Sequence, residues 1–465
     1  MAGIGFQLDR LARTGGLLGI AGAGVYGAVI SSGPWLMTAI AVLVLARWSN
    51  GMMSPADQGL LQTCLVYAFS VSAVIAAPIS MIATRMASDS FYRGNLETVP
   101  STLLCALVWT TSVGLVASYL LFGYAAGMDA FTFILATTIL CLFGQIWVAT
   151  PFLHASRRHR SIFFSYGAGI VMAALPLILL RPSSAAAALA AIATGLVTAV
   201  ALLIRQIRDD FPSFAVWEWG WAAKSRGPLA VGFAGLANAM AVWIDKWISW
   251  WSPTSVAALG MLRVNPVYDQ ASFLGLLTII PGLTLILVTT ETRFDRAFGS
   301  LMEHCTGTSN WRRIEAARQY VGKMIRLDLR LLVVEQAIVA AFCWVTASEL
   351  LRLLNMDARG IFAFRQTALG VVFHLVAIQM SIVLSYYDLF GRVIVVWTVF
   401  LIVSGVETLV FTDLGFGGFG FGYLAGAVAS ASVAVALVSH ATNRLTYLLF
   451  VGNNPAVVGD GRLWS

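Results

Sequence analysis

Two charged side chains interrupt an apolar, tryptophan-rich stretch near the middle of the chain. The segment WIDKWISWW occupies residues 243–251 and carries Asp245 next to Lys246. A carboxylate or an ammonium within a membrane span can carry an ion or hydrogen-bond a polar solute, but each costs roughly 2.5–3.5 kcal/mol to insert into a bilayer. The two residues therefore require a partner or a water-filled cavity.

A helical arrangement of this stretch separates aromatic from polar side chains. At about 100° per residue, one face carries Trp243, Trp247, Trp250 and Trp251. The roughly opposite face carries Asn238, Asp245, Ser249 and Ser252, with Lys246 between the two faces. Such a polar stripe suits a helix that lines a wet cavity. Because neighbours on a helix point apart, Asp245 and Lys246 need not pair with each other.

A second polar group follows in LRVNPVYDQ, residues 262–270. Asn265, Tyr268 and Asp269 lie at the start of the next apolar segment, and Arg263 lies just outside it. Because consecutive spans are antiparallel, Asp269 is expected at the level of Asp245. These groups form either one structural salt-bridge network or one substrate site.

The segment YGAVISSGPWL, residues 26–36, interrupts another apolar run. Ser31, Ser32 and Gly33 precede Pro34, which removes a backbone hydrogen bond and clashes with the preceding turn. The helix is therefore expected to kink or unwind there. The break is either a gate facing a pathway or a packing kink.

Two further polar residues lie within apolar segments that are adjacent in sequence. His374 and Glu407 fall on neighbouring, antiparallel segments near the C-terminus. They are secondary candidates for the pathway. An intramembrane histidine acts either as a proton relay or as a hydrogen-bonded structural residue.

The elements that position these residues are membrane spans. The chain has 465 residues, of which 59% are hydrophobic and 11% are charged, whereas soluble domains carry about 25% charged residues. A span needs about 20 apolar residues, which predicts an all-α polytopic membrane protein with about twelve transmembrane helices. The expected spans are 16–47, 57–86, 99–123, 130–154, 160–181, 184–206, 226–251, 264–292, 328–354, 362–387, 393–412 and 419–445.

Polar stretches divide these spans into two groups of six. The division predicts a bundle at 1–207, a cytoplasmic linker at 208–225 and a second bundle at 226–465. The polar stretch 293–327 predicts a basic amphipathic helix near 311–327 that lies along the membrane surface. Its basic residues are expected to dock cytoplasmic partners or to bind lipid headgroups: Arg312, Arg313 and Arg318.

The charge distribution fixes an orientation and excludes several function classes. Most of the 29 Lys and Arg residues fall in segments on the same side of the membrane as the N-terminus. The positive-inside rule therefore puts both termini in the cytoplasm, and it explains the positive net charge without a nucleic-acid partner. The sequence contains neither a P-loop, nor a Cys/His cluster, nor a plausible Ser/His/Asp constellation. We therefore expect no catalytic residues, no metal and no cofactor, and a protein that is not an enzyme.

Several segments resemble the PelG family of exopolysaccharide exporters. The specific ones are MAGIGF at 1–6, YGAVISSGPWL at 26–36, WIDKWISWW at 243–251 and YDQASFLGLLTIIPGLTLILVTTETRF at 268–294. Weaker similarity continues through SYYDLFGR at 385–392 and GFGFGYLAG at 418–426. The resemblance extends over nearly the whole chain.

The resemblance implies a twelve-helix transporter related to the multidrug/oligosaccharidyl-lipid/polysaccharide flippase superfamily, with two six-helix bundles around a central cavity. It also implies a bacterial inner-membrane protein that passes an N-acetylhexosamine-rich polymer to the periplasm for the biofilm matrix. The implied partners are a cytoplasmic UDP-sugar glycosyltransferase, a membrane receptor for cyclic-di-GMP and a helical-repeat scaffold protein.

For such an exporter, Asp245 is expected to face the cavity and to hydrogen-bond sugar hydroxyls or a cation such as Arg263. Lys246 is expected beside Trp243 and Trp250. Three alternatives stay open. The first is a cation-coupled small-molecule antiporter with an acidic ion carrier, namely Asp245, Asp269 or Glu407. The second is a flippase for lipid-linked oligosaccharides, and the third is a non-transporting membrane scaffold for a glycosyltransferase.

Overall fold

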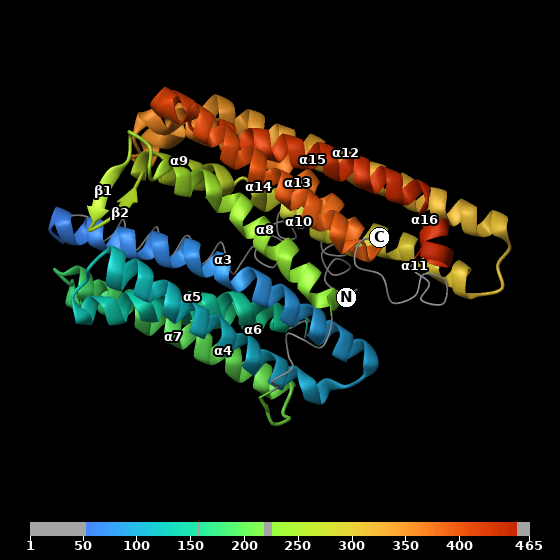
Figure 1. Ribbon diagram of the computed structural model, residues 1–465, viewed down its shortest axis with the longest axis horizontal. Coiled ribbons are helices and arrows are strands. Elements are labelled where there is room, and N and C mark those ends of the chain that lie inside the picture. Colours follow the sequence, from blue (N-terminus) through green and yellow to red (C-terminus); the bar gives the residue numbers. More distant parts are fainter. Residues whose placement is uncertain (1–52, 156–158, 218–225, 453–465) are drawn as a thin grey trace, which may run out of the picture. The chain divides into compact units, whose positions relative to one another are not determined.

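A computed structural model describes residues 53–155, 159–217 and 226–452, and these are almost entirely helical (Figure 1). The longer helices are α3 (Pro55–Arg93), α4 (Val99–Ser118), α5 (Ala130–Ala155), α6 (His159–Leu180), α7 (Ala185–Asp210), α8 (Arg226–Ser249), α9 (Pro266–Leu276), α10 (Ile279–Thr289), α11 (Asp295–Thr306), α12 (Trp311–Leu353), α13 (Ile361–Tyr386), α14 (Phe390–Phe411) and α15 (Phe421–Asn443). The short elements are η1 (Leu96–Thr98), η2 (Tyr119–Ala125), β1 (Val256–Leu259), β2 (Leu262–Val264), η3 (Thr290–Phe294), η4 (Ala358–Gly360), η5 (Thr412–Gly418), α16 (Leu445–Tyr447) and η6 (Leu448–Gly452).

The described residues form two compact units. The N-terminal unit contains the described residues up to Trp243 together with Ser255–Asn265. The C-terminal unit contains Ile244–Thr254 and the described residues from Pro266 onward. Helix α8 thus contributes to both units, and contacts divide the chain inside this helix instead of at the polar stretch 208–225. A division into two six-helix bundles at 208–225 stays a prediction.

The fold class is confirmed as that of an all-α polytopic membrane protein. Among the described residues, eleven helical segments are long and apolar enough to cross a membrane. They run from Pro55–Arg93 to Phe421–Asn443 and correspond one to one with the last eleven spans expected from the sequence. The first expected span, 16–47, lies outside the described residues, and with it the candidate gate residues Ser31, Ser32, Gly33 and Pro34.

Close backbone packing joins two helices of the N-terminal unit. A Cβ atom added to Gly169 on α6 would lie 2.8 Å from the carbonyl oxygen of Gly195 on α7. Only glycine permits that approach, and small residues at helix contacts are typical of membrane bundles, where van der Waals packing drives association. The backbones of α6 and α7 are therefore in direct van der Waals contact at these two glycines.

A two-stranded hairpin, which the sequence did not predict, follows α8. Strands β1 and β2 pair antiparallel, and Gly260 between them has a φ of 55°, which favours glycine. The hairpin is fastened within the N-terminal unit, because Met261 N–H donates to the carbonyl of Ala125 and the Tyr67 hydroxyl donates to the carbonyl of Arg263, at 2.8 Å and 2.7 Å.

In the C-terminal unit, α13 is the most enclosed span, and α9, α12 and α15 pack around it. The apolar core between α9, α12 and α13 includes Tyr268, Ala347 and Phe364. The span that begins at Pro266 is interrupted between α9 and α10. Pro281 explains the interruption, because its nitrogen has no hydrogen to donate to the carbonyl of Leu277 four residues earlier.

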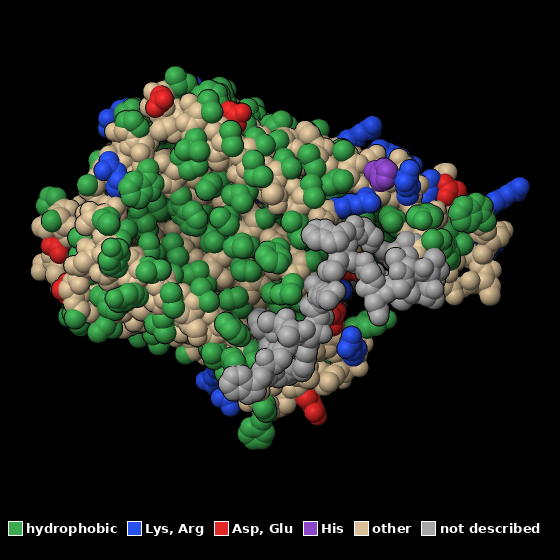
Figure 2. All heavy atoms as spheres, viewed as in Figure 1, with side chains coloured by type: hydrophobic (Ala, Val, Ile, Leu, Met, Phe, Trp, Pro, Cys, Tyr) green, Lys and Arg blue, Asp and Glu red, His purple; other side chains and the backbone are tan. Residues whose placement is uncertain are grey.

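The basic segment near 311–327 is the first half of α12, a continuous helix of 43 residues. At 1.5 Å per residue it is about 64 Å long, roughly twice the 30 Å thickness of the hydrocarbon core. The basic segment is therefore not a helix of its own but continues into the span, and its position relative to the membrane surface stays a prediction. Asn310 caps the start of α12 by accepting from Arg313 N–H at 3.0 Å. Lys and Arg side chains gather at this end of the C-terminal unit (Figure 2).

Candidate functional site

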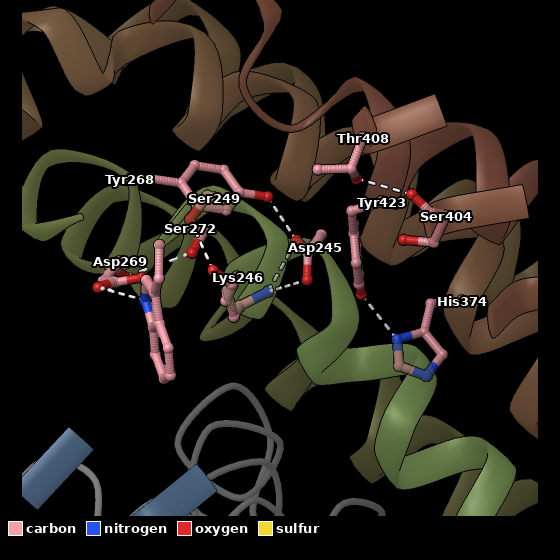
Figure 3. A network of polar contacts seen from close by, with 11 residues as sticks. Asp245, Lys246, Ser249, Tyr268, Asp269, Ser272, His374, Ser404, Thr408 and Tyr423 are labelled. Atoms are coloured by element: carbon pink, nitrogen blue, oxygen red, sulfur yellow. Dashed lines mark hydrogen bonds and ion pairs between the residues drawn. The ribbon is translucent and has the colours of Figure 1, made fainter. Parts of the chain in front are cut away.

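Asp245 and Lys246 lie in the last two turns of α8 and are buried, with 0% and 3% of their surface exposed. The Lys246 ammonium donates to both carboxylate oxygens of Asp245 at 3.0 Å (Figure 3). The two neighbours therefore pair, although their positions on the helix did not require it. Their backbone directions diverge, but the flexible four-carbon stem of lysine lets its ammonium turn back to the carboxylate.

Two tyrosines complete the surroundings of this ion pair. The Tyr268 hydroxyl on α9 donates to Oδ2 of Asp245. The Lys246 ammonium lies 5.9 Å from the ring centre of Tyr268 and 5.4 Å from that of Tyr423 on α15. Both distances are within cation–π range. The sequence instead predicted Trp243 and Trp250 as the neighbours of Lys246.

The network continues from Tyr423 to His374 on α13. The Tyr423 hydroxyl and Nδ1 of His374 lie 2.7 Å apart, and both side chains are buried. The imidazole packs edge-on against Trp397 and Phe400, with ring centres 5.7 Å and 5.1 Å away. A Cβ atom on Gly370 would lie 2.7 Å from the Tyr423 ring, so the glycine makes room for this tyrosine.

Asp269 forms a separate contact near the same helix end. Its two carboxylate oxygens each accept from the Trp250 indole N–H at 3.0 Å (Figure 3). Ser249 donates to the carbonyl of Lys246, at 2.7 Å. The structure thus brings Asp245, Lys246, Tyr268 and Asp269 into one polar region, as the antiparallel spans predicted.

Three expected pathway residues belong to the N-terminal unit. Arg263 donates through Nε to the Ser255 hydroxyl and through Nη2 to the Ser255 carbonyl, at 2.9 Å and 3.1 Å. The cation that pairs with Asp245 is Lys246. Asn265 is fully buried, and Asn238 is half-buried on α8 with an amide oxygen that has no hydrogen-bond partner among the described residues.

Glu407 is half-buried on α14. The hydrogen bonds among the described residues connect His374 with Tyr423 and give no bond between His374 and Glu407. The two secondary candidates are therefore not one relay in this structure.

The ion pair is enclosed. A cavity of about 10 Å³ lies beside Ser249, Tyr268 and Thr408, and Asp245 does not line it. That volume holds roughly one water molecule. Breaking a buried pair by removing one partner typically costs about 3–5 kcal/mol, because the remaining charge is uncompensated. This geometry favours a structural ion pair over a substrate site: Asp245 and Lys246 join α8 to α9 through Tyr268.

An aromatic cluster in the N-terminal unit was not predicted from the sequence. Phe69 on α3 contacts Trp147 on α5 and Trp243 on α8, with ring centres 5.4 Å and 6.0 Å apart. Both tryptophans are half-buried, and the Trp147 indole N–H has no hydrogen-bond partner among the described residues. No local sequence signal links these three residues, since they come from three separate spans.

The three basic residues near the start of α12 differ in their surroundings. Arg312 and Arg313 are exposed. Arg318 is partly buried, binds Glu315 through Nε at 2.9 Å and donates through Nη1 to the Thr442 carbonyl at 3.0 Å. That carbonyl lies in the last turn of α15, so Arg318 satisfies a helix end and fastens α12 to α15.

Comparisons with known proteins, by family and by structure, both indicate a membrane transporter. Residues 1–450 match the family PelG, described as "Putative exopolysaccharide Exporter (EPS-E)". No protein with a curated description matches the chain.

Several solved structures share the fold at low sequence identity. A MOP superfamily transporter from Pyrococcus furiosus is 14% identical, with 91% of this chain and 96% of that chain covered and a TM-score of 0.59. A MATE transporter in the bent conformation is 14% identical, covers 96% and 99% of the two chains, and has a TM-score of 0.61. An outward-facing multidrug resistance MATE transporter is 16% identical, covers 90% and 96%, and has a TM-score of 0.58. The chain is thus a multi-pass membrane protein with a transporter fold.

Proposed function

Because the chain belongs to the PelG family of exopolysaccharide exporters, we propose that it passes an N-acetylhexosamine-rich exopolysaccharide across the bacterial inner membrane, from cytoplasm to periplasm, with both termini in the cytoplasm. The family match over residues 1–450 carries this proposal. The MOP-type fold supports a membrane transporter, and the sugar, the direction and the compartment are part of the proposal.

Neutral polar and aromatic groups suit a sugar polymer. Sugar rings stack on aromatic faces, and their hydroxyls both donate and accept hydrogen bonds. In the N-terminal unit, Trp147 and Trp243 offer half-buried indole rings, and Asn238 offers an amide oxygen without a protein partner among the described residues. We assign these three residues to the polymer pathway.

The contacts of Asp245 argue against this residue as the ion carrier of a cation-coupled antiporter. An ion carrier needs a carboxylate that can bind and release Na⁺ or a proton. The Asp245 carboxylate already holds the Lys246 ammonium at 3.0 Å from both oxygens and a hydroxyl from Tyr268. A tethered ammonium cannot dissociate into solution, so this carboxylate is a poor site for a travelling cation.

The exposed start of α12 is the proposed docking surface for cytoplasmic partners. Arg312 and Arg313 lie on the half of the helix that exceeds the length of a span. A glycosyltransferase that supplies the polymer must lie close to the exporter, and a membrane receptor for cyclic-di-GMP and a helical-repeat scaffold would complete the assembly. Arg318 is excluded from this surface because its contacts are intramolecular.

Reconstitution tests the proposal. The protein and its glycosyltransferase are placed in inverted vesicles, UDP-sugar is added outside, and a glycoside hydrolase later digests all accessible polymer. We expect hydrolase-resistant polymer inside the vesicles, and none when the exporter is omitted. An ionophore should leave this yield unchanged, whereas loss of yield with the ionophore would favour a cation-coupled transporter. Complete digestion in the presence of both proteins contradicts the proposal.

A further inference from the structure

An apolar groove runs along the C-terminal unit between α12, α13 and α15. It encloses about 780 Å³. Its lining is almost entirely aliphatic and aromatic, and includes Leu329, Val333, Trp344, Leu369, Val372 and Val435. Val333, Trp344 and Val435 remain 37–38% exposed, so the groove opens to the surroundings of the spans.

The small side chains of α12 create the groove. Ala337, Ala340 and Ala341 line its middle, where larger residues would fill the space. From Leu329 to Trp344 the lining follows α12 over fifteen residue steps, about 22 Å at 1.5 Å per residue. One leaflet of a bilayer contributes about 15 Å of hydrocarbon, so a lipid tail can fill most of this length.

A cation marks one end of the groove. Arg365 lies one turn before Leu369 on the same face of α13. Its Nε donates to the Trp344 carbonyl at 3.1 Å, and its guanidinium lies 5.4 Å from the Trp344 ring centre. Arg365 is thereby held beside Trp344, the last lining residue of the groove along α12.

Arg365 differs from the other arginines at the same end of the unit. Arg352 binds Glu349 at 2.7 Å. Arg359 binds Asp357 and holds the pKa of that carboxyl below its usual range. Arg365 has no carboxylate within ion-pair distance in the described parts of the chain. Its guanidinium therefore keeps a planar pair of donors for a bidentate anion such as phosphate.

We propose that the groove is a binding site for an anionic phospholipid, with one acyl chain along α12 and the phosphate on Arg365. The groove lies among spans and its partly exposed side chains are apolar, as on a surface that faces acyl chains. Arg365 lies seven residues into its span from Ala358, about 10 Å from that helix end. That depth suits a headgroup phosphate drawn slightly inward from the interface.

Lipid titration with two variants tests the site. The protein is purified in detergent, phosphatidylglycerol or phosphatidylethanolamine is added, and bound lipids are counted by native mass spectrometry. We expect phosphatidylglycerol to bind more tightly than phosphatidylethanolamine. Arg365→Gln should weaken the phosphatidylglycerol complex about fivefold, the factor that corresponds to about 1 kcal/mol for one basic residue near a lipid surface.

A second variant distinguishes the contribution of the groove to lipid binding from that of the charge. Ala341 is exposed on the groove wall, so Ala341→Phe fills the groove without displacing core residues and should weaken both lipids. Arg352→Gln removes a charge from the same end of α12 outside the lining and should leave binding unchanged. Equal affinity for the two lipids, or equal losses in Arg352→Gln and Arg365→Gln, would overturn the proposal in favour of unspecific annular lipid.

Discussion

The side-chain amide of Gln336 on α12 donates to the backbone carbonyl of Thr278, at 2.6 Å. Thr278 lies at the interruption between α9 and α10, the two parts of one span. Gln336 is fully buried. A backbone break within a span frees polar groups that lipid cannot satisfy, so a neighbouring helix must do so. The break caused by Pro281 is therefore stabilised from α12.

Gln336→Leu should destabilise the protein. The substitution leaves the Thr278 carbonyl without its partner, which costs about 1–3 kcal/mol for a buried acceptor. A lower midpoint of thermal unfolding in detergent is the expected result. Gln319→Leu, on the exposed face of the same helix, is the matched control and should behave like the unmodified protein. Identical midpoints for both variants would contradict a structural role for the bond.

The pair Asp245–Lys246 should behave as one unit. Asp245→Asn or Lys246→Met alone leaves a buried charge and should reduce the amount of folded protein by the equivalent of roughly 3–5 kcal/mol. The combined Asp245→Asn and Lys246→Met variant removes both charges and should recover most of this loss. Normal abundance of Asp245→Asn with weakened export would instead support a direct contact between Asp245 and sugar.

The basic residues of α12 should separate into two groups. Arg312→Glu with Arg313→Glu should reduce co-purification of the glycosyltransferase while leaving thermal stability unchanged, since both side chains are exposed. Arg318→Glu should lower stability, because it places a carboxylate against Glu315 and the Thr442 carbonyl. If all three changes reduce co-purification equally at unchanged stability, Arg318 belongs to the docking surface after all.

The aromatic cluster of the N-terminal unit predicts a specific export defect. Trp147→Leu and Trp243→Leu keep apolar volume but remove the flat ring surface, so export should fall while protein abundance stays near normal. Trp251→Leu is the control, because this tryptophan is 71% exposed and lies outside the cluster of Phe69, Trp147 and Trp243. Vesicle export assays measure the difference. Equal export by all three variants would remove Trp147 and Trp243 from the pathway.

The orientation can be measured with single cysteines on a Cys305→Ser background. Thr308 and Gly417 are exposed on the connection before α12 and the connection before α15. We expect a cysteine at Gly417 to react with a membrane-impermeant reagent in cells with a permeabilised outer membrane. A cysteine at Thr308 should react only after the inner membrane is opened. The reverse pattern would invert the topology inferred from the positive charges.

The sequence predicts span positions well because a bilayer imposes about 20 apolar residues on each crossing, wherever the helix packs. It also predicts the polar region around Asp245 and Asp269, because consecutive spans are antiparallel. The partners of Lys246 were not predictable in this way. Tyr268 and Tyr423 reach it from α9 and α15, and only tertiary packing determines which rings meet.

Two other differences have local causes. The continuity of α12 was missed because the change from basic to apolar residues near Leu327 resembles a boundary, and Asp328, a residue type that often caps helices, follows directly. The cluster of Phe69, Trp147 and Trp243 was missed because each residue alone resembles an ordinary lipid-facing or core aromatic. That the Trp147 indole N–H has no hydrogen-bond partner in the described ranges can be recognised only when its neighbours are known.

The length of α12 makes it a lever. A single helix carries the span and the exposed segment with Arg312, without a hinge between them. If a rod of about 64 Å tilts by about 10° at its membrane-embedded end, its far end swings by about 11 Å. A protein bound at Arg312 would move with that end of the helix. A force that such a protein applies at Arg312 would in turn act on the membrane-embedded part of α12 over the full length of the helix.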